Sequence, residues 1–146
     1  MENKYNFLDI PTKNLQGKEG NVSGFTALGQ AGSDAFTGLE TFPNPGCISV
    51  AYESDEVTAV CPVTGQPDFY GVSLNLFRTD LLVESKSLKI WFRDLHNKGI
   101  FCEGLAVYIR DQIGAVLGLD EDEIYNSVQV TLTQKSRGGI SITSVA

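Results

Sequence analysis

The sequence predicts an α+β domain in which four antiparallel strands form one sheet and two helices cover one of its faces. Two observations favour this fold class. Near both ends of residues 47–146, apolar residues alternate with small or polar ones, as they do in half-buried strands. In the middle they recur at every third or fourth position, as they do on one face of a helix. The expected order is strand–strand–helix–helix–strand–strand (ββααββ).

The first two strands are expected on either side of a turn. Apolar side chains alternate from Ile48 to Tyr52 and again from Tyr70 to Leu76. Between them lies Cys61–Tyr70, with the sequence CPVTGQPDFY. Two prolines and a glycine within so short a stretch favour a turn over a helix or a straight strand.

Two helices are predicted next. The first has one apolar face, formed by Leu88, Trp91, Phe92 and Leu95. Ser85 is expected to be its N-cap, and the helix should end near residues 97–99. The second should run from Phe101 to a closing Gly118. The acidic stretch Asp120–Glu123 is expected to be a solvated loop.

The last two strands are predicted as a hairpin. Apolar residues alternate from Val128 to Thr133, the segment SRGG forms the turn, and Ile140 and Ile142 continue the alternation. Residues 1–46 are interrupted by repeated glycines and end in PNPG, so we expect them to form an irregular arm. The chain is therefore expected to hold one domain, at 47–146.

Charge and composition limit the possible functions. A net charge of −7 argues against non-specific binding to nucleic acid and against attraction to anionic membranes. No apolar run approaches the ~20 residues that span a bilayer, and the N-terminus lacks the apolar core of a signal peptide, so a cytoplasmic protein is expected. With three scattered cysteines and one histidine, neither a disulfide framework nor a metal site is expected.

The predicted turn carries the residues best suited to chemistry. Cys61 and Asp68 are brought toward one point, and a thiol with an acid beside it can perform covalent chemistry on an electrophilic carbon. As a nucleophile, Cys61 would need a lowered pKa, and Asp68 would have to hold a proton. The structural alternatives are a buried thiol and a carboxylate that caps the turn.

Several segments together resemble the 7-cyano-7-deazaguanine reductases. They are CPVTGQPDF, ESKSLKIW (residues 84–91), FR, FCEG (101–104) and SRGGISI (136–142), and they occur in the family's order over roughly residues 48–142. The resemblance implies the tunnelling fold (T-fold), in which the sheets of several subunits join into a barrel with active sites between subunits. A homo-oligomer, a pentamer or a decamer, is therefore expected.

The resemblance also implies an activity. The family reduces the nitrile of 7-cyano-7-deazaguanine to 7-aminomethyl-7-deazaguanine with NADPH, and the product is a precursor of the modified tRNA base queuosine. Cys61 would attack the nitrile carbon to form a thioimide, Asp68 would protonate the nitrogen, and NADPH would supply two hydrides.

Binding residues follow from the same resemblance. Glu103 would accept hydrogen bonds from N–H groups of the base, and the other implied substrate contacts are Cys102, Val83 and Ser85. Serines and helix N-terminal amides would hold cofactor phosphates while lysines neutralise the 2′-phosphate, which gives the cofactor set Ser85, Lys86, Ser87, Lys89, Arg137 and Gly138. Without the resemblance, ESKSLK is a helix start with solvated charges, Glu103 favours a helix N-terminus and Arg137 is a turn residue.

Cys102 departs from the family pattern, which has histidine immediately before the glutamate. A thiol is a poorer proton relay than an imidazole, so a Cys102→His change is expected to raise the rate. The departure leaves two other functions open. One is a non-reducing transferase that adds ammonia to a deazaguanine nitrile in nucleic acid, and the other is a purine- or pterin-binding protein of the same fold. The intact ESKSLKIW segment favours the reductase, because a non-reducing enzyme needs no phosphate site.

Overall fold

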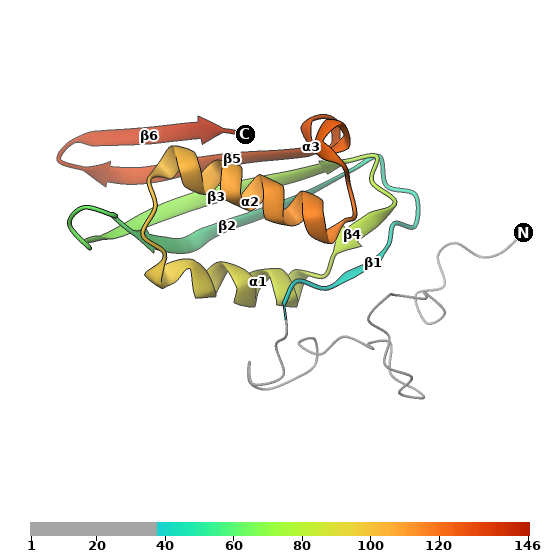
Figure 1. The fold of residues 1–146 in the computed structure, drawn as a ribbon, viewed down its shortest axis with the longest axis horizontal. Coiled ribbons are helices and arrows are strands. Elements are labelled where there is room, and N and C mark those ends of the chain that lie inside the picture. The colour runs from blue at the N-terminus through green and yellow to red at the C-terminus, as the bar shows by residue number, and fades with distance from the viewer. Residues whose placement is uncertain (1–37) are drawn as a thin grey trace, which may run out of the picture.

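The computed structural model describes residues 38–146. Its main layer is an antiparallel sheet with the strand order β2-β3-β5-β6. Helices α1 (Ser85–Arg93) and α2 (Cys102–Val116) lie over one face of this sheet (Figure 1). The four strands are β2 (Ser49–Val60), β3 (Pro67–Phe77), β5 (Val128–Arg137) and β6 (Ile140–Val145).

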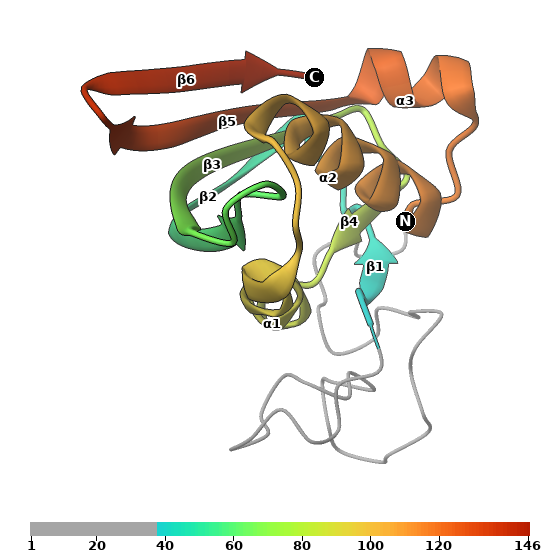
Figure 2. The ribbon, with the colours of Figure 1, turned by 60° about the vertical axis from the view of Figure 1, so that its left-hand side comes forward.

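Further elements extend the predicted order. Strands β1 (Thr41–Pro43) and β4 (Leu81–Val83) pair antiparallel in a small second sheet beside α1 (Figure 2). A 3₁₀ turn, η2 (Asp94–Asn97), follows α1, and α3 (Glu121–Ser127) precedes β5. An α+β fold with antiparallel sheets is confirmed, whereas the predicted element order was incomplete. Of the expected N-terminal arm, residues 1–37 lie outside the described residues.

Strand β2 is longer than the alternation from Ile48 to Tyr52 predicted. Its pairing with β3 shifts register between Ser54 and Val57. Before the shift the inward positions are even-numbered, as at Tyr52, and after it they are odd-numbered, as at the fully buried Val57 and Ala59. A bulge inserts residues into one strand and reverses which positions face the core. The alternation in the first half of β2 therefore does not continue through the second half, and the sequence pattern predicts only the first half.

Two predicted helix boundaries were wrong. The N-cap of α1 is Glu84 and not Ser85, because the Glu84 carboxylate accepts hydrogen bonds from the backbone N–H groups of Lys86 and Ser87, both at 2.7 Å. The acidic stretch after α2 is no loop, since Asp120 and Glu123 form a reciprocal capping box that starts α3. In both places a carboxylate stabilises the first turn of a helix.

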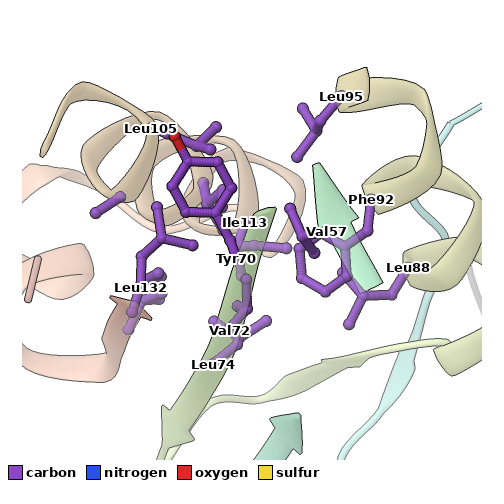
Figure 3. Packing of buried hydrophobic residues seen from close by; sticks show 14 of the residues in the cluster. Val57, Tyr70, Val72, Leu74, Leu88, Phe92, Leu95, Leu105, Ile113 and Leu132 are labelled. Atoms are coloured by element: carbon purple, nitrogen blue, oxygen red, sulfur yellow. The ribbon is translucent and has the colours of Figure 1, made fainter. Parts of the chain in front are cut away.

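The hydrophobic core fills the space between the sheet and the two long helices (Figure 3). Leu105, Ile109 and Ile113 follow one another along one face of α2 and are fully buried against the sheet. Burying each such side chain contributes about 1.5–3 kcal/mol. This packing fixes the beginning of α2 above Tyr70 in β3 (Figure 3). Within residues 38–146, no helix has the length and apolar character needed to cross a membrane.

Candidate active site

Cys61 and Asp68 lie at the closed end of the β2–β3 hairpin. Asp68 stands directly opposite Ala59 in the ladder, and Cys61 comes two residues after Ala59. The Cys61 N–H donates to the Gln66 carbonyl at 2.8 Å, which continues the pairing beyond the strand ends. Because side chains two residues apart along a strand share a face, the thiol and the carboxyl lie on the face that the helices cover. Their exposed fractions are 7% for Cys61 and 6% for Asp68.

The turn between the two strands lowers the pKa of the Cys61 thiol from its ordinary value of 9.0 to about 7. The largest cause is a hydrogen bond with the Thr64 side chain, followed by hydrogen bonds from the backbone of Thr64 and Val63, with a smaller contribution from Arg137; burial acts in the opposite direction. Each of these hydrogen bonds favours the thiolate. A large share of the thiol is therefore ionised near neutral pH and available as a nucleophile.

The Asp68 carboxyl has two partners from the end of β5. The Arg137 Nε lies 3.4 Å from Asp68 Oδ1, and Gln134 Nε2 donates to the same oxygen at 3.4 Å. Arg137 also donates from Nη1 to Gln66 Oε1 at 2.7 Å. Arg137 was expected among the cofactor residues, but it lies beside Cys61 and Asp68. Gly138 follows at the β5–β6 turn, where its φ of 62° favours glycine.

The beginning of α2 supplies Cys102 and Glu103. Glu103 is exposed in the first turn of the helix. Cys102 is 1% exposed, and its Sγ lies 3.8 Å from the Leu132 carbonyl oxygen and 3.5 Å from Ser144 Oγ. Burial raises the pKa of the Cys102 thiol. The expected contact between this thiol and a substrate stays a prediction, and an imidazole at position 102 would have to displace part of the core before it could assist a reaction.

Two further residues that were predicted to contact ligands are buried within the single chain. The Val83 side chain is 1% exposed in the core, and its carbonyl accepts a hydrogen bond from the Tyr52 hydroxyl at 2.8 Å. Ser87 is 0% exposed; its hydroxyl donates to the Glu84 carbonyl at 2.8 Å and accepts from the Glu40 N–H at 3.0 Å. Both residues join the β1–β4 sheet region to the rest of the fold.

A side chain lies where a phosphate was expected at the start of α1. The backbone N–H groups of Lys86 and Ser87 already bind the Glu84 carboxylate. A buried negative charge at this helix terminus takes the place that a phosphate would occupy, and it repels a second anion. A cofactor phosphate could bind these amides only by displacing the Glu84 carboxylate.

A groove of about 990 Å³ runs between β2 and α1. Ser85, Lys86 and Lys89 line its α1 side, and Cys61 and Asp68 lie outside it. The α1 side is basic and the β2 side is acidic. The charged residues are Lys86, Lys89 and Arg93 on the first and Glu53, Asp55 and Glu56 on the second. Within one chain, the predicted catalytic pair thus lies apart from the predicted cofactor residues of α1, whereas Arg137 lies with the catalytic pair.

Three residues of the site were not assigned to it from the sequence. Thr64 lies inside the CPVTGQPDF segment, so its closeness to Cys61 could have been found from the turn alone. Gln134 comes from β5, and Tyr70, directly opposite it in the ladder, was interpreted only as a buried strand residue. The closeness of Gln134 to Asp68 depends on the register between β3 and β5, which no short motif encodes.

Curated relatives share most of the chain. The proteins named NADPH-dependent 7-cyano-7-deazaguanine reductase from Granulibacter bethesdensis, Syntrophus aciditrophicus and Frankia casuarinae are 33%, 36% and 35% identical to it. The matches cover 84%, 84% and 80% of this chain and 80%, 85% and 90% of the relatives, in the same order. No protein-family model matches the chain.

A solved structure shares the fold. The archaeosine synthase QueF-Like in its apo form superposes with a TM-score of 0.58 at 20% identity, over 69% of this chain and 93% of that one. At this identity the likeness concerns the fold alone. The family follows from the curated relatives, whose identity and coverage span both the Cys61 turn and the ESKSLKIW segment: the chain belongs to the NADPH-dependent 7-cyano-7-deazaguanine reductases.

Proposed function

We propose that this protein reduces the nitrile of 7-cyano-7-deazaguanine to an aminomethyl group, with NADPH as the reductant. The observation that carries the proposal is the Cys61 thiol, whose pKa is lowered to about 7 on the same face of the hairpin as the buried Asp68 carboxyl. A reactive thiolate beside an acid is what addition to a nitrile requires. Membership of the reductase family identifies the substrate class.

The residues of the hairpin end would carry the covalent step. The Cys61 thiolate forms a sulfur–carbon bond to the nitrile carbon as one carbon–nitrogen π bond breaks, and the nitrogen takes a proton from the Asp68 carboxyl. The product is a thioimide on Cys61. NADPH, when bound, supplies the two hydrides that reduce this carbon stepwise. Between the two reductions the sulfur–carbon bond breaks and Cys61 leaves as the thiolate. In total, two NADPH and two protons are consumed for each nitrile.

The α1 side of the groove carries the positive charge that a cofactor phosphate requires. Lys86 and Lys89 line it with Ser85, and two ammonium groups with a hydroxyl suit a 2′-phosphate. Ser87 and the helix amides are left out of the proposed cofactor site, because they are buried or bound to Glu84. In the proposed complex, lysine side chains therefore bind the phosphate without help from the helix N-terminus.

Glu103 is proposed to anchor the base. Its carboxylate is exposed at the start of α2, where it can accept hydrogen bonds from ring and exocyclic N–H groups. A carboxylate that pairs with such donors discriminates against bases that lack them.

A ring of subunits with the tunnelling fold is part of this proposal. The outer strands of the main sheet are β2 and β6, so each can pair with a strand of a neighbouring subunit. The separation of the groove from Cys61 supports a site completed by a second copy, whose groove would face the Cys61 end of the first. Light scattering of the purified protein should then give a mass that is a multiple of the chain mass, and a monomer would contradict the ring.

The activity is tested with the purified full chain and the nitrile base. Wild type should form a thioimide, seen by absorbance and by an increase in intact mass, and should then oxidise two NADPH for each base. Cys61→Ala should form no adduct while remaining folded. An adduct without NADPH oxidation would contradict reduction, and if ammonia were incorporated it would indicate the transferase. The absence of any adduct in wild type would remove the covalent mechanism.

A further inference from the structure

Tyr70 has a buried hydroxyl that makes no hydrogen bond within residues 38–146. The residue is 0% exposed, and its ring rises from β3 toward α2, with the hydroxyl beside Leu105 (Figure 3). Buried polar atoms nearly always have a partner, and burying one without a partner costs free energy. A phenylalanine would fill the same space without that cost. The hydroxyl therefore requires an explanation that packing does not give.

The surroundings of this hydroxyl are the proposed site. Tyr70 follows Asp68 by two residues on β3, so both side chains lie on the same face. The pKa of Tyr70 is raised to about 12, first by burial and then by the charge of Asp68. Cys102 and Glu103 raise it slightly further, and Arg137 lowers it. The phenol is therefore protonated at neutral pH. A ligand meets a neutral hydroxyl, which is a good hydrogen-bond donor.

The contacts that close this region are weak. Gln134 lies directly opposite Tyr70 in the β3–β5 ladder, and its Nε2 is 3.4 Å from Asp68 Oδ1. Arg137 Nε is also 3.4 Å from that oxygen, and its side chain is 42% exposed. Both distances exceed the usual length of an N–H···O hydrogen bond. A ligand that bonds to Asp68 can therefore replace both side chains at this oxygen and reach the hydroxyl behind them, while Arg137 keeps its 2.7 Å hydrogen bond to Gln66.

We propose that the Tyr70 hydroxyl donates a hydrogen bond to the nitrogen of the bound nitrile, next to Asp68, an inference that rests on the proposed function. The exposed fraction is 7% for Cys61, 6% for Asp68 and 0% for Tyr70, which places the Tyr70 hydroxyl deepest of the three groups. The nitrile nitrogen is the atom that lies beyond the carbon attacked by sulfur. Negative charge develops on this nitrogen as sulfur adds, and a fixed donor stabilises it. Asp68 still transfers the proton, so Tyr70 changes no proton or electron count.

The test is Tyr70→Phe, which removes one oxygen and keeps the ring. Thioimide formation with the nitrile base should slow by about 100-fold, the usual effect of removing one such donor. The denaturant concentration at the midpoint of unfolding should not fall, because the hydroxyl that is removed makes no hydrogen bond within residues 38–146. Tyr125→Phe is the matched control: Tyr125 is 69% exposed on α3, and its variant should form the adduct at the wild-type rate.

Binding separates this inference from the proposed function. In a Cys61→Ala background no adduct can form, and calorimetry with the nitrile base then reports reversible affinity. Adding Tyr70→Phe should weaken that affinity by about 3- to 10-fold, as expected for one neutral hydrogen bond. If wild type forms no adduct but this loss of affinity is seen, the covalent mechanism fails and the Tyr70 contact stands. Equal affinity of the single and double variants, or an unchanged adduct rate in Tyr70→Phe, would overturn the contact itself.

Discussion

The Thr64 side chain forms a hydrogen bond with the Cys61 thiol from three residues further along the same turn, and this bond is the largest cause of the lowered pKa of Cys61. Both residues are held by the hairpin end, where the Gly65 N–H donates to the Cys61 carbonyl at 2.9 Å. Gly65 has a φ of 69°, which other residues adopt only with strain. The geometry that activates the thiol is thus built into one short loop.

Thr64→Val should raise the pKa of Cys61 from about 7 toward its ordinary value of 9.0. Because only the thiolate reacts, the alkylation rate of wild type should rise through pH 7 and level off above it, whereas the variant should reach the same plateau at higher pH. The measurement is the pH dependence of iodoacetamide labelling in a Cys47→Ser background, since Cys47 is exposed. Identical profiles for Thr64→Val and its parent would show that the hydroxyl does not set the pKa.

Lys89→Ala should raise the KM for NADPH by about tenfold, as expected for loss of one charge-assisted hydrogen bond to phosphate. Lys89 is exposed on α1 and lines the groove. NADH lacks the 2′-phosphate, so its KM should stay the same in the variant. Steady-state kinetics with both cofactors make the comparison, with Lys89→Arg as the variant that keeps the charge. An equal increase of KM for NADPH and NADH would place the 2′-phosphate elsewhere.

The sequence predicts those parts of the fold whose pattern is long enough to show a period. Helix α2 spans 15 residues and the β5–β6 hairpin has clear alternation, and both occur close to where they are expected. Strands β1 and β4 have three residues each, too few for any alternation to be recognised. The second half of β2 could not be recognised for a different reason. The bulge moves the core-facing side chains from even-numbered to odd-numbered positions, which interrupts the alternation.

The same distinction applies to the site. Cys61 and Asp68 are predictable as a pair because one short turn carries both. Gln134 reaches Asp68 only through strand register, and such a contact cannot be inferred from a local motif. The Glu84 cap could not be predicted, because the sequence of a helix start is the same whether a phosphate or the side chain of Glu84 binds its amides. Only the fold decides which anion is there.

Tyr52→Phe and Tyr70→Phe should change stability in opposite directions, although the chemical change is the same. The Tyr52 hydroxyl donates to the Val83 carbonyl at 2.8 Å, so its removal should lower the free energy of unfolding by about 1 kcal/mol. The Tyr70 hydroxyl has no partner within residues 38–146, so its removal should leave this free energy unchanged or raise it by about 1 kcal/mol. Urea denaturation of both variants gives the two values. A loss in Tyr70→Phe as large as that in Tyr52→Phe would mean that the Tyr70 hydroxyl is bonded in solution.

Gly114→Ala should destabilise the protein through the contact between α2 and α3. A Cβ at position 114 would overlap the Ile124 side chain, so this side chain or α3 itself would have to shift. Overpacking of this kind typically costs about 1–3 kcal/mol, which exceeds the gain of up to about 1 kcal/mol from the better helix propensity of alanine. Gly71→Ala is the matched control, because a Cβ at position 71 has no neighbour within 4 Å. Unfolding midpoints should therefore fall for Gly114→Ala and hold for Gly71→Ala, and a stabilised Gly114→Ala would mean that α3 does not pack on α2 as described.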